Sequence, residues 1–330
     1  MALRKITQRT AQPVPVDTAR EDGVGAGFAT ATDPGHSSWG FAEGDEFVPG
    51  RTVLAALGGG AVAEALLVWD ERLHAVTVAK VLRPVHACDE AALRSLRHEA
   101  RALQALAHPA LVRSFDVELD GPRPHLLLEH LEGRTLRSLI RRGGPLPAEQ
   151  ALPLALHLAA ALHFLAHSGW VHLDVKPDNV IMGIPPRLID LSLARPVERA
   201  ASLSGPTGTD AYMAPEQCAP DRFPGAVSPA TDIFGLGATL FHALTAQRPF
   251  PRHDDARDAR DPDVRFPQLA TPPAPVPEHV SRPLAKLLTQ MLDPEPAARP
   301  SAAEVVERLE PLVEVLPRKL VLSRRGMRAR

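Results

Sequence analysis

Residues 172–181 read HLDVKPDNVI, and three polar side chains in this stretch point to one kind of chemistry. Asp174, Lys176 and Asn179 are separated by two and three positions, and Pro177 stiffens the segment between them. Because an apolar pair follows at once, we expect these side chains to share a short, rigid loop between buried segments. An aspartate can accept a hydroxyl proton, a lysine can neutralise a phosphoryl group, and an asparagine oxygen can bind Mg²⁺. These are the tasks that phosphoryl transfer requires.

The stretch resembles the catalytic loop of protein kinases, H-R-D-L-x-x-x-N, with Leu173 in place of the arginine. The resemblance implies catalytic roles for Asp174 and Lys176 and a metal-binding role for Asn179. It also implies an α+β fold with two lobes. The small N-lobe would hold a five-stranded antiparallel sheet and one helix, and the larger C-lobe would be mainly helical.

The composition indicates a globular chain without a strong preference for charged partners. Of its 330 residues, 45% are hydrophobic and 23% are charged, which suits one two-lobed unit or two ordinary domains. The formal net charge of -2 gives no electrostatic reason to expect nucleic acid as a partner. Cys88 and Cys218 lie far apart and form no metal-binding spacing or disulfide framework.

We read neither a signal peptide nor an apolar run of about 18 residues in the chain. The sequence therefore predicts a soluble, cytoplasmic protein without a transmembrane segment. The predicted segments are a disordered or loosely attached leader (1–48), an N-lobe (49–128), a hinge (129–133), a C-lobe (134–313) with a Pro-rich surface insertion (251–277), and a basic tail (314–330). A solvated tail is the expected state, with weak binding to acidic lipid or nucleic acid as the alternative.

The N-lobe pattern is that of a small sheet and one amphipathic helix. The predicted strands are 51–57, 65–69, 75–82, 110–119 and 125–128, and a helix capped by Asp89 is predicted to about residue 107. A glycine turn is expected at 58–60. Against the kinase pattern G-x-G-x-x-G-x-V, Gly58 and Gly60 match, whereas Ala63 and Ala65 replace the third glycine and the valine.

Lys80 stands inside an apolar strand, where an unpaired ammonium group would be costly. Glu99 borders the apolar stripe of the predicted helix and is the candidate counter-ion, although a surface glutamate beside an arginine is the ordinary alternative. The kinase resemblance favours the Lys80–Glu99 pair. It further implies an ATP-binding set of Gly58, Gly60, Ala65, Val78, Lys80, Glu99, Leu128, Glu129, Leu131 and Ile181.

A second carboxylate follows the catalytic loop. Asp190 lies 11 residues after Asn179, in the sequence LIDLS, at the place of the kinase D-F-G motif. The resemblance implies that Asp190 binds Mg²⁺ together with Asn179. Leu191 and Ser192 replace the phenylalanine and the glycine, and loss of the glycine would restrict a change of backbone conformation.

The segment that ends in Ala214-Pro215-Glu216 resembles the peptide-binding region of protein kinases. Thr209 would contact the catalytic aspartate and lysine, and Glu216 would pair with Arg299. Asp232, in the first turn of a predicted helix, would accept N–H groups from the catalytic loop, although an acidic residue there also suits the helix dipole. The predicted C-lobe helices are 135–142, 147–167, 231–246, 281–292 and 301–312, the last with a capping box.

These residues lie in the right order over residues 50–313, so the chain resembles the eukaryotic-like (Hanks-type) serine/threonine kinases of bacteria. The resemblance implies transfer of the γ-phosphate of Mg-ATP to serine or threonine hydroxyls of proteins. One alternative is a pseudokinase that binds nucleotide or acts as a scaffold, which the changes at Ala63, Leu173 and Ser192 favour. The other is a small-molecule phosphotransferase, which the 208–216 segment disfavours.

Leu173 makes the chain a non-RD variant, because the replaced arginine usually receives the activation-loop phosphate. We therefore predict that activity depends little on phosphorylation of Ser202, Ser204, Thr207 or Thr209.

Overall fold

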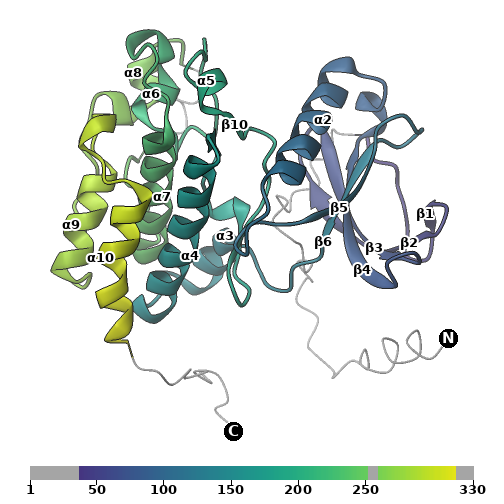
Figure 1. Cartoon of the computed structure of the whole chain (residues 1–330), viewed down its shortest axis with the longest axis horizontal. Coiled ribbons are helices and arrows are strands. Elements are labelled where there is room, and N and C mark those ends of the chain that lie inside the picture. Colours follow the sequence, from purple (N-terminus) through teal and green to yellow (C-terminus); the bar gives the residue numbers. More distant parts are fainter. Residues whose placement is uncertain (1–36, 252–258, 317–330) are drawn as a thin grey trace, which may run out of the picture.

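A computed structural model describes residues 37–251 and 259–316 of the chain. The elements form two lobes (Figure 1). One lobe is a sheet with helix α2 (Glu90–Ala105), and the other is a larger group of helices. The α+β fold with a small sheet lobe and a mainly helical lobe is thus confirmed. Residues 1–36 of the predicted leader and 317–330 of the predicted tail lie outside the described residues.

The main sheet has six antiparallel strands, one more than predicted, in the order β1-β2-β3-β4-β6-β5. Its strands are β1 (Glu46–Val48), β2 (Arg51–Gly59), β3 (Ala63–Asp70), β4 (Ala75–Leu82), β5 (Ser114–Glu118) and β6 (His125–Glu129). The additional strand, β1, pairs with β2 at the edge of the sheet. The prediction missed it because three residues are too few to show an alternating pattern.

The two faces of the sheet are covered by different parts of the chain. Because strand side chains alternate, Val78 faces the core that includes Leu96 of α2, whereas Ala79 and Val81 face the opposite side. Asp89 caps α2 as predicted, and its carboxylate accepts a hydrogen bond from Ala91 N at 2.9 Å. Helix α2 contacts β5 and β6, and its Glu99 reaches Lys80 of β4.

The opposite face of the sheet is covered by the segment 37–48, which the sequence assigned to a loose leader. Phe47 is fully buried, and Trp39 and Phe41 pack against the same cluster. Trp39 Nε1 donates to Leu82 O at 2.8 Å, and the guanidinium of Arg123 lies over both the Trp39 and Phe41 rings. The described part of this segment is therefore an integral part of the sheet lobe, and the predicted boundary at residue 48 is wrong there.

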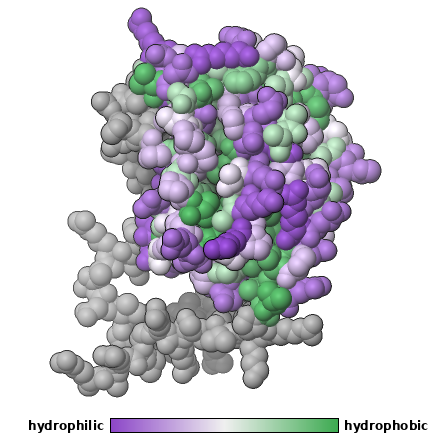
Figure 2. Space-filling model, turned by 90° about the vertical axis from the view of Figure 1, so that its left-hand side faces the viewer, coloured by the Kyte–Doolittle hydropathy of each residue, from purple (hydrophilic) through white to green (hydrophobic). Residues whose placement is uncertain are grey.

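The helical lobe is built around two apolar helices, α4 (Ala148–His167) and α7 (Pro229–Thr245), which pack against each other. The remaining elements of this lobe are α3 (Leu136–Gly143), β7 (Trp170–Val171), η2 (Pro177–Asn179), β8 (Val180–Ile181), β9 (Arg187–Leu188), β10 (Arg195–Pro196), α5 (Val197–Ala200), α6 (Pro215–Cys218), η3 (Pro220–Arg222), α8 (Pro262–Arg265), η5 (Pro267–Leu269), α9 (Arg282–Met291), η6 (Pro296–Ala298) and α10 (Ala302–Glu314). The predicted capping box of the last helix is present, with Ser301 and Glu304 bonded to each other's backbone N–H groups. Hydrophilic residues predominate on the outer end of this lobe, with hydrophobic residues in small groups between them (Figure 2).

Helix α4 needs separate mention because of its apolar composition. Within residues 37–251 and 259–316, it is the single helix long and apolar enough to cross a membrane by length and composition. The sequence reading had counted no such stretch. In the fold, α4 packs against α7 and α10, and Leu154, Leu158 and Leu165 are fully buried. These contacts make α4 a core helix of this lobe.

The predicted insertion at 251–277 is not wholly a surface feature. Residues 252–258 lie outside the described residues, but α8 and η5 follow, and Phe266 between them is buried. Gln268 Nε2 donates to Asp210 O at 2.7 Å and to Met213 O at 3.0 Å. This part of the segment therefore holds residues 210–213 in place through Gln268. A single aromatic residue among prolines and charges gave no periodic signal for this packing.

Candidate active site

The catalytic-loop stretch lies between β7 and β8 and is fixed by a buried carboxylate. Asp232 of α7 accepts hydrogen bonds from His172 N at 2.7 Å and Leu173 N at 2.8 Å. Leu173 has a φ of 68°, a left-handed conformation that a leucine rarely adopts. Burial raises the pKa of Asp232, although the two N–H groups oppose this effect. The loop thus has a defined backbone shape imposed by α7.

Asp174, Lys176, Asn179 and Thr209 form one hydrogen-bonded group. Lys176 Nζ lies 2.7 Å from Asp174 Oδ2 and donates to Thr209 Oγ1 at 2.8 Å. Thr209 Oγ1 donates to Asp174 Oδ1 at 2.7 Å. Asn179 Nδ2 donates to Asp174 O at 3.0 Å and Oδ2 at 3.1 Å. The contacts that the sequence expected for Thr209 are present, and all four side chains meet around one carboxylate.

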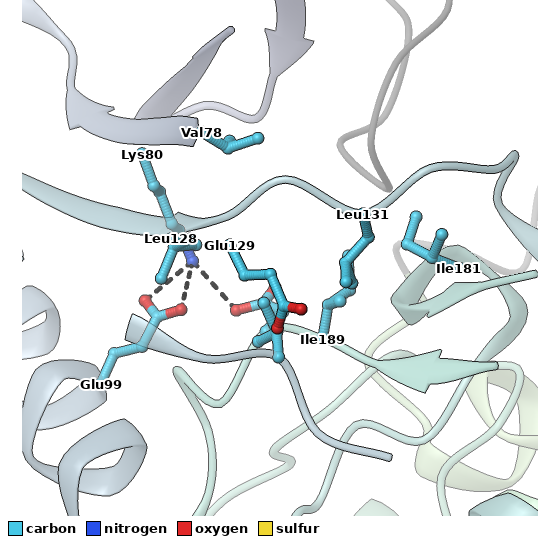
Figure 3. A pocket seen from close by; sticks show the side chains of 10 residues that line it. Val78, Lys80, Glu99, Leu128, Glu129, Leu131, Ile181 and Ile189 are labelled. Atoms are coloured by element: carbon cyan, nitrogen blue, oxygen red, sulfur yellow. Dashed lines mark hydrogen bonds and ion pairs between the residues drawn. The ribbon is translucent and has the colours of Figure 1, made fainter. Parts of the chain in front are cut away.

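Lys80 lies between two carboxylates at the other side of the cleft. Its Nζ is 2.9 and 2.8 Å from the two carboxylate oxygens of Glu99, and 3.0 Å from Asp190 Oδ1. Figure 3 shows the ammonium group reaching from β4 towards Glu99 on α2. The expected Lys80–Glu99 pair is present. The contact with Asp190 was not predicted, and it joins the nucleotide lysine to the second metal-ligand candidate.

One ammonium group shared by two carboxylates shifts the pKa of each group. Burial lowers the pKa of Lys80, but the charges of Asp190 and Glu99 outweigh burial and raise it. Burial also raises the pKa of Glu99 to about 7, because Lys80 offsets it only in part. For Asp190, the attraction of Lys80 outweighs burial and lowers the pKa. Glu99 is therefore the carboxylate that takes up a proton first as the pH falls.

The raised pKa of Glu99 predicts a pH-dependent contribution to stability. Since the folded value of about 7 exceeds the ordinary value of 4.5, the stabilising contribution is complete below pH 4.5 and is lost as the pH rises through 7. We expect the free energy of unfolding to fall more between pH 5 and 8 in the wild type than in Glu99→Gln, by on the order of 2 kcal/mol. Urea denaturation across this pH range measures the difference. Glu310→Gln, which removes an exposed carboxylate of α10, is the control, and equal slopes for wild type and Glu99→Gln would contradict the prediction.

A mainly apolar pocket opens beside Lys80 at the junction of the lobes. Five of the residues predicted to bind ATP line it besides Lys80 and Glu99, namely Val78, Leu128, Glu129, Leu131 and Ile181. Asp190 also lines the pocket, together with Val112 and Ile189, which sequence reasoning missed. The position of Ile189 next to Asp190 was the one indication in the sequence that Ile189 lies at the pocket. Ala65 is fully buried opposite Lys80 in the β3–β4 pairing and does not line the pocket.

The glycine-rich turn differs in detail from the prediction. β2 continues through Gly59, so the turn lies at 60–62 and not at 58–60. Gly58 has a φ of 108°, which favours glycine. A Cβ on Gly59 would lie 2.6 Å from Ala63 O, whereas a Cβ on Gly60 would meet nothing within 4 Å. Gly59, which the sequence comparison passed over, is thus the glycine required by close packing.

The predicted ion pair of Glu216 and Arg299 is present. Arg299 Nη1 and Nη2 donate to the Glu216 oxygens at 2.6 and 2.9 Å, and both side chains are fully buried. The other N–H groups of Arg299 donate to backbone carbonyl oxygens, one of them Ala230 O at 3.0 Å. The Thr231 hydroxyl also donates to Glu216 at 2.8 Å. This pair ties residues far apart in sequence to the end of the 208–216 segment.

Gln217 is a positioning residue that sequence reasoning missed. Its Nε2 donates to Leu173 O at 2.9 Å and to Thr207 O at 2.7 Å, and its Oε1 accepts from Ala214 N at 3.1 Å. The side chain therefore links the catalytic loop to the 207–214 segment. Its place directly after Ala214-Pro215-Glu216 was the only signal in the sequence.

The oxygen atoms of Asn179 and Asp190 fit a hard divalent cation. Because Nδ2 of Asn179 donates to Asp174, its amide oxygen is the atom left to face the cleft. The Asp190 side chain is 30% exposed, so its carboxylate is accessible from the cleft. Among the described residues, no group of three or more His, Cys, Asp or Glu side chains forms a metal cage. A few oxygen ligands completed by phosphates and water are what Mg²⁺ commonly uses.

Comparison with known proteins agrees with this geometry. The family model for the protein kinase domain matches residues 51–309. Serine/threonine-protein kinase PknB of Mycobacterium leprae is 34% identical over 203 residues, which are 59% of this chain and 32% of PknB. PknB of Mycobacterium tuberculosis is 33% identical over 204 residues, with the same coverage of 59% and 32%. Serine/threonine-protein kinase PknL of Mycobacterium tuberculosis is 33% identical over 202 residues, or 60% of this chain and 50% of PknL. The chain thus spans about a third to a half of the curated relatives it matches.

Proposed function

The chain belongs to the protein kinase family, and from this premise we propose that it transfers the γ-phosphate of Mg-ATP to serine or threonine hydroxyl groups of protein substrates. The matched relatives PknB and PknL are named as serine/threonine-protein kinases. The activity of the present chain is supported by the chemistry of its own side chains.

The observation that carries the proposal is the contact between Asp174 and a hydroxyl group. Thr209 Oγ1 donates to Asp174 Oδ1, so this carboxylate accepts a hydroxyl hydrogen at the base of the cleft. A substrate hydroxyl in the same place would give its proton to Asp174 while its oxygen bonds to the γ-phosphorus. The bond from the γ-phosphorus to the β,γ-bridging oxygen would break, and ADP would leave with that electron pair. Lys176, beside Asp174, would stabilise the negative charge of the group in transfer.

The nucleotide would be held by the pocket between the lobes. Its apolar walls, which include Val78, Leu128 and Ile181, suit a flat base. Lys80 stands at the inner end of the pocket, and its ammonium group would hold phosphate oxygens while Glu99 fixes its direction. Binding and positioning of the two reactants account for most of the catalysis that such a site provides.

We propose that Asn179 and Asp190 bind Mg²⁺ when the nucleotide is present. Their oxygen atoms are ligands of the type that Mg²⁺ prefers, and Asp190 keeps its negative charge because its pKa is lowered. Bound Mg²⁺ supplies neutralisation of phosphate charge. Since Asp190 also contacts Lys80, the same carboxylate orients the lysine that faces the phosphates.

Phosphosite mapping by mass spectrometry, after incubation of the purified chain with Mg-ATP and generic protein substrates, tests the proposal. We expect phosphate on serine and threonine of the substrates or of the chain itself. Nucleotide binding without any transfer would instead support a nucleotide-binding scaffold. Transfer to a small molecule and to no protein would support a phosphotransferase of another kind.

We further propose that the chain is a non-RD kinase whose activation segment is held by apolar packing. Leu173 is buried in a cluster with Val171, Ala200 and Val227, and Val197 and Leu203 pack against it. An arginine that binds a phosphorylated residue would need polar, accessible surroundings at this position. Leu173 instead packs against apolar residues of the segment that follows Asp190. A phosphate is therefore not required to hold this segment in place.

Treatment with a protein phosphatase is accordingly expected to leave at least about half of the transfer activity, because Leu173 contributes packing and not charge recognition. Mass spectrometry of the treated chain verifies that phosphate has been removed. A loss of more than tenfold, reversed when Ser202, Ser204, Thr207 or Thr209 is phosphorylated again, would show that the segment does depend on phosphate.

We also propose that this unit acts in the cytoplasm, where ATP is supplied. Cell fractionation tests this point, and recovery of the chain only outside the cytoplasmic compartment would contradict it.

A further inference from the structure

The cleft that holds the catalytic group extends along one wall into a basic region. A cavity of about 910 Å³ is lined by Lys176 and Thr209 and, farther along, by Arg137, Tyr212 and Arg248. Arg137 comes from α3, and Arg248 follows α7, so two elements remote in sequence present guanidinium groups to the same space. The cavity is continuous with the place where a substrate hydroxyl would meet Asp174.

Contacts around Tyr212 fix this basic wall. Arg137 Nη1 donates to the Tyr212 hydroxyl oxygen at 3.4 Å, and that oxygen lies 2.7 Å from His242 Nδ1. The Tyr212 and His242 rings are also stacked, with centroids 6.1 Å apart. The positive charge of Arg248 also acts on the Tyr212 hydroxyl group. The tyrosine thus holds Arg137 in place, and among the described residues the other N–H groups of Arg137 have no acceptor.

The positive charge of this wall is not balanced by nearby carboxylates. Within the part of the chain that the structure describes, no carboxylate forms an ion pair with Arg137 or Arg248, and Asp178, which also lines the cavity, acts on Tyr212 through its charge alone. Burial and the charges of both arginines lower the pKa of His242 to about 4. His242 is therefore neutral near pH 7. The other acidic lining residues, Asp89, Glu99 and Asp190, belong to the α2 and Lys80 side of the cavity, so Asp178 is the carboxylate set against the two guanidinium groups.

The position of Arg137 gives no advantage to its own helix. It lies in the first turn of α3, where the helix dipole disfavours a cation and where acidic residues are preferred. Arg141 and Arg142, in the last turn, are placed as helix stability favours. Helix propensity therefore does not explain an arginine at 137, whereas recognition of an anion in the cavity does.

We propose that Arg137 and Arg248 form a specificity subsite that binds an anionic side chain, a carboxylate or a phosphate, close to the acceptor hydroxyl of the substrate. This inference rests on the proposed kinase function and adds the substrate class. Each guanidinium offers a planar pair of N–H donors that matches carboxylate and phosphate oxygens. Substrates with acidic or previously phosphorylated residues near the acceptor would then be selected over basic ones.

Peptides of one neutral sequence around a threonine test the subsite. Glutamate, phosphoserine, alanine or lysine is placed at each flanking position in turn, and kcat/KM and binding by fluorescence anisotropy are measured. For the wild type, we expect at least one position where glutamate or phosphoserine exceeds alanine by about tenfold, as a charge-assisted hydrogen bond predicts. The ratio should fall towards one in the double variant Arg137→Gln/Arg248→Gln, and it should decrease with added salt.

Arg141→Gln, on the same helix but exposed and outside the cavity, is the matched control and should keep the wild-type ratio. Single variants Arg137→Gln and Arg248→Gln serve if the double variant folds poorly, and a ratio of rates is insensitive to a partial loss of folded protein. Preference for glutamate and phosphoserine supports an acidic substrate class, and preference for phosphoserine alone supports a previously phosphorylated one. A preference for lysine, or an acidic preference that persists in the double variant, would overturn the inference.

Peptide binding and phosphoryl transfer, measured separately, distinguish this inference from the proposed function. Selective binding of anionic peptides without any phosphoryl transfer would support the subsite and contradict the kinase activity. Transfer to neutral and anionic peptides at equal rates would support the kinase activity and overturn the subsite.

Discussion

Asp174→Asn is expected to reduce phosphoryl transfer by about 10²- to 10⁴-fold, the range usual for loss of a positioned general base. The amide keeps the size of the carboxylate but cannot accept a proton at neutral pH. It also loses the ion pair with Lys176, which is 2.7 Å long in the structure, and the charge that accepts the Thr209 hydroxyl. Initial rates of ³²P transfer to a protein substrate at saturating Mg-ATP measure the effect.

Nucleotide affinity should change little in Asp174→Asn, because the pocket around Lys80 does not include Asp174. Binding of a fluorescent ATP analogue, together with the thermal midpoint, shows whether the variant remains folded and able to bind nucleotide. Asp120→Asn, at an exposed turn of the sheet lobe, is the control for loss of a carboxylate elsewhere. A transfer rate within threefold of the wild type would exclude Asp174 as the base.

Arg299→Ala is expected to lower the free energy of unfolding by about 3–5 kcal/mol, the cost of leaving one charge of a buried pair without its partner. Glu216 is fully buried and receives two of the five N–H groups of Arg299, while the others hold backbone carbonyl oxygens. Removal of the guanidinium therefore leaves a carboxylate and several carbonyl oxygens unsatisfied at one point. Urea denaturation followed by circular dichroism measures the loss.

The matched control is Arg308→Ala on α10, whose side chain is exposed and bonded to Gln290. Its effect should stay within about 0.5 kcal/mol, as for most surface substitutions. In the double variant Glu216→Gln/Arg299→Ala, part of the lost stability should return because the unpaired charge is gone. A cost below about 1 kcal/mol for Arg299→Ala alone would show that water reaches the site and replaces the arginine.

The long-range pairs of the site could be predicted because each member violates a local rule. A lysine within an apolar strand requires a partner, and Glu99 beside an apolar stripe is a candidate, but the kinase resemblance was needed to prefer this pair over a surface glutamate beside an arginine. The same reasoning links Glu216 to Arg299. The two lobes and most of the catalytic group followed from the resemblance to protein kinases, and these requirements agreed with it.

What could not be predicted depends on three or more groups that meet in space. The sharing of Lys80 between two carboxylates, and the basic wall formed with Arg248, require the lobes and helices to be placed first. Gln217 has no charge and satisfies only backbone groups, so no local rule is violated in its sequence. The buried Phe266 stands alone among prolines and polar residues, where periodicity gives no signal.

The segment 37–48 precedes the matched kinase domain and contacts residues next to the glycine-rich turn. Ser38 and Trp39 bond to Glu64, at the start of β3, and the guanidinium of Arg83 joins Ser37 O to Gly60 O across the glycine turn. Displacement of this segment would break these contacts and leave Glu64 and Arg83, both next to the glycine-rich turn, without these partners. The outer face of the sheet is thus linked to the glycine-rich turn by side chains that lie outside the cleft.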